Sequence, residues 1–508
     1  MRVENWHLNE QADTTEVSAD VDGYRLWYRV SKPYRISRAG DPFLAAALLP
    51  AMRQGEKLEI DPRLSVSPKL LQNVSLLQEI FHSWIPKELK IIPVSATTSP
   101  AEPLNTGVMS FFSGGVDSTY TFLKRKKEIS HVVNIHGQDF FFESGGTSTF
   151  SMTDLKDLAQ FAWKLMLPYD RVSAYLKGRL SQTTLQTLSN FRDTGSEPGR
   201  VEAALVEELN SIVSGQPIYE ARRFACVNLR PETRQLLARN PQGEDLRGLN
   251  RLLLEDAFAR ELVGKYSGAY TSAIERNARF VQGFGKDLIT VETNFYPFGY
   301  RYNLSRSASQ GPCLGSVALL LGMPRVFVSA SCSYNQLIPS GTHPLTDPLW
   351  SNECVEVIHD GAEAGRLEKI RIICGCESAM ANLRVCFHDA NVNCGTCDKC
   401  VRTMIALKLL KVSSAPFPPL PPPKALRKNM PVNVIELPYL KENLDLAIQS
   451  DDRELRDLLC DCVKRLELKR AIWDLDRLLL GGFIDRAYQK IVKVPPTFRR
   501  VDSEPPGS

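Results

Sequence analysis

"VMSFFSGGVDSTYTFLKRKKE", residues 108–128, decides how this sequence is interpreted. Its apolar start predicts a buried strand over residues 108–112, and the run from Val116 onward predicts a helix that ends in several basic side chains. The turn between them therefore lies at a helix N-terminus. Two adjacent glycines allow backbone N–H groups to face one point, and serine hydroxyls add donors, so the turn suits phosphate oxygens. The residues predicted to bind phosphate are Ser113, Gly114, Gly115, Val116, Asp117 and Ser118.

Asp117 is a carboxylate beside this predicted anion site. Repulsion between the carboxylate and phosphate would be relieved by Mg²⁺ between them, and we count Asp117 and Ser118 as candidate catalytic residues. An alternative stays open: the glycines form a tight strand-to-helix turn, and Asp117 and Ser118 only cap the helix.

A second constellation lies in "LRVCFHDANVNCGTCDKCVRTMIALKLL", residues 383–410. Four thiolates at these close spacings suit a tetrahedral zinc ion, which would be structural because protein fills every ligand position. A [4Fe–4S] cluster, redox-active thiols and unliganded buried cysteines are the alternatives. His388 is a further possible ligand, although a surface position fits it better. The predicted ligands are Cys386, Cys394, Cys397 and Cys400.

The motif S-G-G-x-D-S after a strand resembles the PP-loop of the ATP pyrophosphatases, which include asparagine synthetase, GMP synthetase and tRNA lysidine synthetase. The lysine of a Walker loop is missing from this turn. The resemblance implies that the loop holds the pyrophosphate part of ATP while a substrate attacks the α-phosphorus. An adenylated carboxylate can then accept an amine, because AMP is a good leaving group. ATP, Mg²⁺ and Zn²⁺ are the cofactors expected.

Together, the PP-loop and the four cysteines resemble the 7-cyano-7-deazaguanine synthase family. The resemblance covers about residues 105–143 and 272–411, including "HGQDF", where His136, Gly137 and Gln138 match a family Gly-Gln after the second strand. It implies ATP-dependent adenylation of a deazapurine carboxylate and its amination. The chain is longer than ordinary members and resembles enlarged relatives from bacterial antiviral operons, in which the same chemistry would join a deazapurine to a protein partner.

The stretch "IPSGTHPLTDPLWSNE", residues 338–353, follows an expected strand and supplies further candidates. His343 could contact phosphate or move a proton, Asp347 could accept from an exocyclic amine, and Trp350 could stack on a base. A loop held by prolines around a buried tryptophan explains the same residues equally well. Arg366 and Lys369 could contact phosphate, although charges on a helix surface are commoner. Cys313, Cys332 and Cys354 fit buried apolar positions better than nucleophiles.

The chain is expected to be an α/β protein with a parallel-sheet PP-loop domain over residues 105–411. "HVVNIHG", "DLITVETNF" and "PRVFVSAS" predict its later strands. A helical insertion is expected over 144–272 and a zinc knuckle over 386–400. An α/β module over 1–104 precedes this domain. A proline-rich linker over 412–424 and a helical region over 425–508 follow it.

Composition restricts the classes of partner. The 508 residues carry 62 basic and 58 acidic side chains, a net charge of +4, so no global field attracts nucleic acid. RNA modification is accordingly disfavoured. No apolar run reaches the ~18 residues of a membrane helix, and the cytoplasm is the expected location. Three functions stay open: an amidating enzyme for a deazapurine carboxylate, a ligase that uses the insertion or flanking modules to bind a protein partner, and a catalytically quiet ATP-binding scaffold.

Overall fold

The apolar strands expected after residue 105 form one parallel sheet. The structure is a computed structural model that describes residues 1–137, 272–302, 304, 306–386, 392–412, 416–427, 430 and 436–480. These residues belong to one compact unit, Met1–Phe140 with Gly268–Ser508. The insertion expected over 144–272 lies outside the described residues up to residue 271, as do Gln138 and His388.

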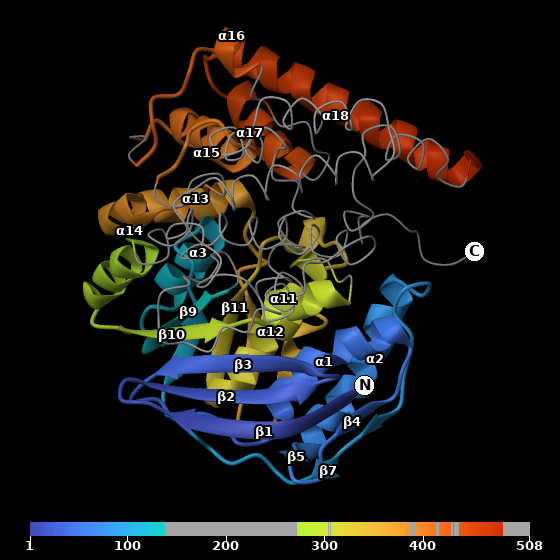
Figure 1. The fold of residues 1–508 in the computed structure, drawn as a ribbon. Coiled ribbons are helices and arrows are strands. Elements are labelled where there is room, and N and C mark those ends of the chain that lie inside the picture. Colours follow the sequence, from blue (N-terminus) through green and yellow to red (C-terminus); the bar gives the residue numbers. More distant parts are fainter. Residues whose placement is uncertain are drawn as a thin grey trace, which may run out of the picture. The chain divides into compact units, whose positions relative to one another are not determined.

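A ten-stranded, mostly parallel sheet organises this unit and confirms the α/β class (Figure 1). In spatial order its strands are β12 (Glu356–Asp360), β11 (Arg325–Ser329), β8 (Val108–Phe111), β9 (His131–His136), β10 (Asp287–Thr293), β3 (Tyr24–Ser31), β2 (Thr14–Val21), β1 (Arg2–Glu10), β4 (Leu58–Ile60) and β6 (Val94–Ser95). A second sheet pairs β5 (Ser65–Val66) with β7 (Thr97–Thr98).

The five strands from β12 to β10 are parallel throughout. From β8 the chain moves outward through β9 to β10, then returns to the other side of β8 for β11 and β12. The order reverses between β8 and β11, and open α/β sheets bind their ligands at the carboxyl ends of the strands at such a point. The turn after β8 occupies this position.

The first hundred residues extend the same sheet. Strand β3 pairs antiparallel with β10, with Val30 opposite Val291 and Tyr28 opposite Thr293. Buried polar contacts hold β3 in place: Thr293 of β10 donates to the Trp27 carbonyl at 2.8 Å, and the Tyr28 hydroxyl lies 2.5 Å from the hydroxyl of Ser316 on the helix over 306–321. The domain boundaries expected at residues 104, 411 and 424 stay predictions.

Helices cover the sheet and continue beyond it. Those from the first part of the chain to the knuckle are α1 (Asp41–Gln54), α2 (Pro68–Trp84), α3 (Val116–Arg125), a helix over 272–282, α11 (Phe295–Arg301), α12 (Arg306–Leu321), α13 (Arg366–Cys374) and α14 (Glu377–Asn382). Short 3₁₀ turns are η1 (Tyr334–Gln336) and η2 (Asp347–Trp350). The C-terminal helices are α15 (Asp398–Leu409), α16 (Pro423–Leu426), α17 (Leu437–Ile448) and α18 (Arg453–Leu480), and α15 and α17 stack beyond α13 (Figure 1).

An aromatic cluster fixes α3 and the helix over 272–282 next to β8. Phe112 stacks on Phe280 with ring centroids 5.6 Å apart, and Phe122 meets both rings from α3. All three side chains are buried. Because this packing begins at the residue before the turn, it holds both ends of the glycine turn rigidly.

Candidate functional site

The turn from Ser113 to Ser118 connects β8 to α3 as the sequence predicts. Gly114 has a φ of +77°, which glycine adopts without strain, and Gly115 is the N-cap of α3. Helix α3 has no side-chain N-cap. The Ser118 hydroxyl donates to the Gly115 carbonyl at 3.2 Å, and the Asp117 carboxylate pairs with Arg366. The first N–H groups of α3 are therefore not satisfied by a capping side chain, as an anion site requires.

Asp117 binds two cations from α13. Its Oδ2 lies 3.0 Å from Arg366 Nη1, and its Oδ1 lies 3.2 Å from Lys369 Nζ. Burial opposes the ionisation of Asp117, but the charges of Arg366 and Lys369 outweigh it and hold the pKa of the carboxyl below its usual value. Asp117 is thus ionised at neutral pH. Both of its oxygens are already engaged by cations.

Lys369 connects the two loops at the switch point of the sheet. It is 1% exposed, and its Nζ donates to the Ala330 carbonyl, one residue beyond β11, at 2.6 Å as well as to Asp117. Arg366 is also largely buried, and its Nε has no partner among the described residues. Of the two explanations for this pair, the surface one is therefore wrong, and both cations lie beside the turn.

Helices beyond the proline-rich stretch support Arg366. The Tyr439 ring of α17 contacts two guanidinium groups, and its centroid lies 5.1 Å from Arg366 Cζ and 4.1 Å from Arg402 Cζ. Arg402 in turn pairs with Glu436. Glu442 accepts a hydrogen bond from the Leu367 amide at 2.7 Å and so caps α13 at the turn that carries Arg366. The C-terminal helices therefore help to hold the cations that face Asp117.

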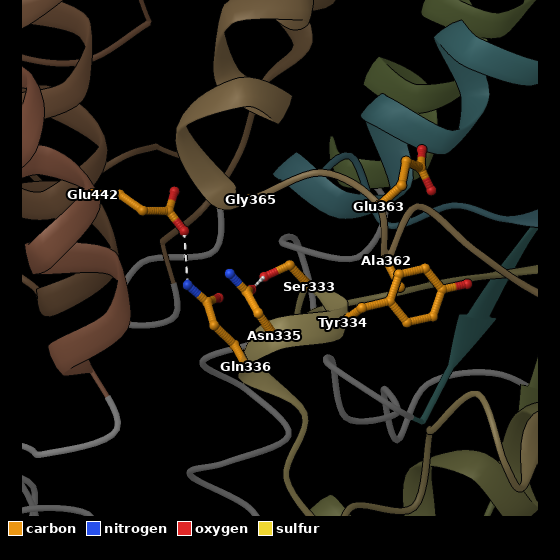
Figure 2. Close-up of a pocket in the computed structure, with 8 residues that line it drawn as sticks. All are labelled: Ser333, Tyr334, Asn335, Gln336, Ala362, Glu363, Gly365 and Glu442. Carbon is orange, nitrogen blue, oxygen red and sulfur yellow. Dashed lines mark hydrogen bonds between the residues drawn. The ribbon is translucent and has the colours of Figure 1, made fainter.

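A cavity of about 370 Å³ opens beside α13 (Figure 2). Its lining comes from the loops that follow β11 and β12 and from α17: Ser333, Tyr334, Asn335, Gln336, Ala362, Glu363, Gly365 and Glu442. Figure 2 shows Gln336 pointing to Glu442, to which its amide donates at 3.0 Å. Burial works against the ionisation of Glu363, but hydrogen bonds from Lys124 and Tyr120 outweigh it and lower its pKa to about 2. Because Glu363 is paired with Lys124, the acidic lining of the cavity is already partly neutralised.

His136 and Gly137 lie at the carboxyl end of β9, the neighbour of β8. The His136 ring is buried, and its Nδ1 lies 3.4 Å from Glu292 Oε1 on β10. Arg29 on β3 approaches the other oxygen of Glu292 at 2.8 Å. These residues form a partly buried polar network at the same edge of the sheet as the turn. The role of His136 and Gly137 in nucleotide binding stays a prediction.

His343 and Asp347 are brought together, but in the interior. Asp347 is 1% exposed and accepts from the His343 amide at 3.2 Å and from the His359 ring at 2.6 Å. Burial raises the pKa of Asp347 above its usual value. On β12, Asp360 accepts a hydrogen bond from Arg125 of α3, and His359 is its neighbour in the strand. Because adjacent residues of a strand face opposite sides of the sheet, His359 and its partner Asp347 lie on the side away from α3. The catalytic role of His343 and Asp347 stays a prediction.

Trp350 is also buried, against α12. A Cβ added at Gly315 would lie 2.6 Å from its indole ring, so the ring fits against the helix backbone. Cys313 is fully buried, and burial raises the pKa of its thiol strongly. The burial of Trp350 and Asp347 therefore agrees with the alternative explanation of residues 338–353, a loop packed around a buried tryptophan.

The four cysteines predicted as ligands converge. The Sγ atoms of Cys386, Cys394, Cys397 and Cys400 all lie within 4.8 Å of one another, with 3.9 Å between those of Cys386 and Cys397. Ligands at about 2.3 Å from a tetrahedral zinc ion are separated by about 3.8 Å, so the arrangement fits a metal such as zinc. Gly395, with a φ of +72°, provides the bend between two of them. A four-cysteine metal site is the part of this prediction that the geometry supports.

Reasoning from the sequence missed three groups near the turn: Tyr439, Glu442 and Arg402. Arg402 could have been found from the sequence, because it lies two residues beyond Cys400 and a side chain so close to a four-cysteine site is held in a fixed position. Tyr439 and Glu442 offered no such signal because they lie on an ordinary amphipathic helix.

Comparisons of the chain with protein-family models, curated proteins and solved structures gave no match. Among the described residues, no helix has the length and apolar character needed to cross a membrane. The functional assignment therefore depends on the residues of the site.

Proposed function

We propose that this protein is an ATP-dependent adenylating enzyme that activates a carboxylate, with release of pyrophosphate, and transfers it to ammonia or another amine. One observation carries the proposal: the S-G-G-x-D-S turn lies at the switch point of a parallel sheet, with two buried cations beside it. Amides, a helix N-terminus and buried guanidinium and ammonium groups are the donors that a leaving pyrophosphate requires. A deazapurine carboxylate is the substrate that the family resemblance implies.

In the proposed reaction, a carboxylate oxygen of the substrate attacks the α-phosphorus of ATP, and the bond from that phosphorus to the bridging oxygen breaks. The negative charge that develops on pyrophosphate is balanced by the amides of the turn, Arg366 and Lys369. Asp117 holds both cations in position. A neutral amine then attacks the acyl carbon and loses a proton to solvent, the bond between that carbon and the phosphate oxygen breaks, and an amide and AMP are formed.

Two metal ions complete the proposal. Mg²⁺, when bound with ATP, would neutralise phosphate charge. Asp117 is the ligand that the sequence predicts for it, and its oxygens would then be shared between Mg²⁺, Arg366 and Lys369. Zinc would occupy the four-cysteine site in a structural role, because protein supplies all four ligands.

Pyrophosphate release by the full-length chain, with ATP, Mg²⁺ and candidate carboxylates, tests the proposal. Asp117→Asn should reduce release at least a hundredfold, since it frees two buried cations from their counter-charge. Asp287→Asn is the matched control, because this exposed carboxylate starts β10 at the opposite edge of the sheet. Undiminished release by Asp117→Asn would refute the role of the turn.

Product analysis separates the remaining functions. A free amide or nitrile supports the small-molecule enzyme, whereas a mass increase on a co-expressed protein supports the ligase that joins a deazapurine to a partner. ATP binding without pyrophosphate release would favour the scaffold.

A further inference from the structure

A second group of polar side chains lies on the Gly114 side of the turn. Asn277, on the helix over 272–282, is fully buried, and its Oδ1 would lie 2.8 Å from a Cβ added at Gly114. Asn382 donates to this Oδ1 at 3.3 Å, and the Arg384 amide donates to the Gly114 carbonyl at 2.9 Å. The Gly114 carbonyl is thereby hydrogen-bonded within the protein. The turn therefore contacts this group both through the space beside Gly114 and through its backbone.

Two side chains in this group, Asn277 and Arg276, carry donor atoms without an acceptor. The Nδ2 of Asn277 is buried without a hydrogen-bond partner in the described part of the chain, and so are the Nε and Nη2 of Arg276. Buried donors are nearly always paired in native proteins, and an unpaired one costs about 1–3 kcal/mol. The Oδ1 of Asn382, the partner of Asn277, is also buried and unpaired, so the two amides hold one free donor and one free acceptor between them. The two unpaired nitrogens of Arg276 have no such acceptor beside them, and they indicate that an acceptor is missing.

The charge around Arg276 points to the sign of that acceptor. Burial and, after it, the nearby positive charges of Arg384 and Arg279 together lower the pKa of Arg276 to about 10. Among the described residues, no carboxylate forms an ion pair with Arg276. An anion at this place would satisfy the free donors and relieve the repulsion between guanidinium groups.

We infer that Arg276 and Asn277 bind the pyrophosphate part of the nucleotide from the Gly114 side of the turn, as a donor set additional to the amides, Arg366 and Lys369. The inference rests on the proposed function and adds two residues to it. Phosphate oxygens are the favoured acceptors because Asn277 lies against Gly114, and the backbone amides next to Gly114 are those proposed to bind pyrophosphate. A guanidinium suits this ligand since it can donate two parallel hydrogen bonds.

Calorimetric titration of the full-length protein with inorganic pyrophosphate and, separately, with AMP tests the inference. Arg276→Gln should weaken pyrophosphate binding about tenfold to a hundredfold, as expected for the loss of a charged hydrogen bond, and should leave AMP binding unchanged. Arg276→Lys should restore part of the affinity. Arg279→Gln is the matched control, because Arg279 is exposed on the same helix.

Asn277→Asp provides a second variant of nearly the same shape. It replaces the unpaired donor by a negative charge and should weaken pyrophosphate binding at least tenfold. Wild-type affinity for pyrophosphate in Arg276→Gln would overturn the inference, and so would an equal loss of affinity for AMP. These outcomes leave the proposed function intact as long as the wild-type chain releases pyrophosphate; a wild-type chain that neither binds nor releases it would overturn both.

Discussion

Replacing Gly114 by alanine should destabilise this protein much more than the same change at Gly115. The two glycines are adjacent in the sequence but differ in their backbone. Gly114 has a φ of +77°, and a Cβ there would lie 2.8 Å from the Oδ1 of the buried Asn277. Gly115 has a φ of −80°, and its nearest neighbour would be the Ser113 hydroxyl at 3.3 Å, at the end of a short side chain.

The size of the difference follows from these values. A left-handed backbone costs an alanine roughly 1–2 kcal/mol, and displacing Asn277 adds to this, for a total of about 2 kcal/mol or more. At Gly115 neither penalty applies in full, so we expect a change below about 1 kcal/mol. A loss of about 2 kcal/mol changes the folding equilibrium by up to about 30-fold.

Urea unfolding followed by far-ultraviolet circular dichroism measures both variants. With a slope of about 3 kcal/mol per M, the midpoint of Gly114→Ala should fall by about 0.7 M relative to the wild type, and that of Gly115→Ala by less than half as much. Both variants should lose pyrophosphate release, because a Cβ in either place obstructs an approaching phosphate. Equal midpoints for the two variants would show that the backbone of the turn differs from the one described.

Four further predictions concern other parts of the molecule. Because the pKa of Asp117 is lowered in the folded protein, its ion pairs stabilise the fold above about pH 4, and this stabilisation is lost as the pH falls through the folded pKa. The difference in unfolding free energy between wild type and Asp117→Asn should therefore shrink below pH 4, and a constant difference would contradict this. Cys397→Ser should lower bound metal, measured by elemental analysis, and the unfolding midpoint, whereas Cys374→Ser, outside the four-cysteine site, should retain the metal. Gly315→Ala should cost about 1–3 kcal/mol in urea unfolding, since the fully buried Trp350 has no room to move; an unchanged midpoint would refute the described packing. Glu442→Ala should cost about 1 kcal/mol and slow pyrophosphate release through Arg366, whereas Asp445→Ala, one turn along α17, should do neither.

The elements around the turn could be predicted because their signals are local. Apolar runs gave β8, β9, β10 and β11, and the glycine pair located the turn between β8 and α3. Strand β12 was not predicted. Its sequence, Glu356–Asp360, contains several polar residues, and two of them, His359 and Asp360, are accommodated by bonds to Asp347 and Arg125 that no local pattern reveals.

The surroundings of Asp117 were beyond sequence reasoning for a related reason. Lys369 lies 252 residues further along the chain, and a lysine on an amphipathic helix has the same local pattern whether it faces solvent or a buried carboxylate. Only the crossover from β12 into α13 decides which of these applies. By contrast, the four cysteines were predictable as a group because three of them lie within seven residues and a glycine bends the chain between them.

The antiparallel pairing of β3 with β10 has a consequence for how this protein can be shortened. A chain trimmed to begin near residue 105 would keep every residue of the proposed pyrophosphate site, yet it would leave the backbone groups of β10 as an open edge, ready to pair with another molecule. Trimmed versions should therefore self-associate rather than yield a minimal enzyme.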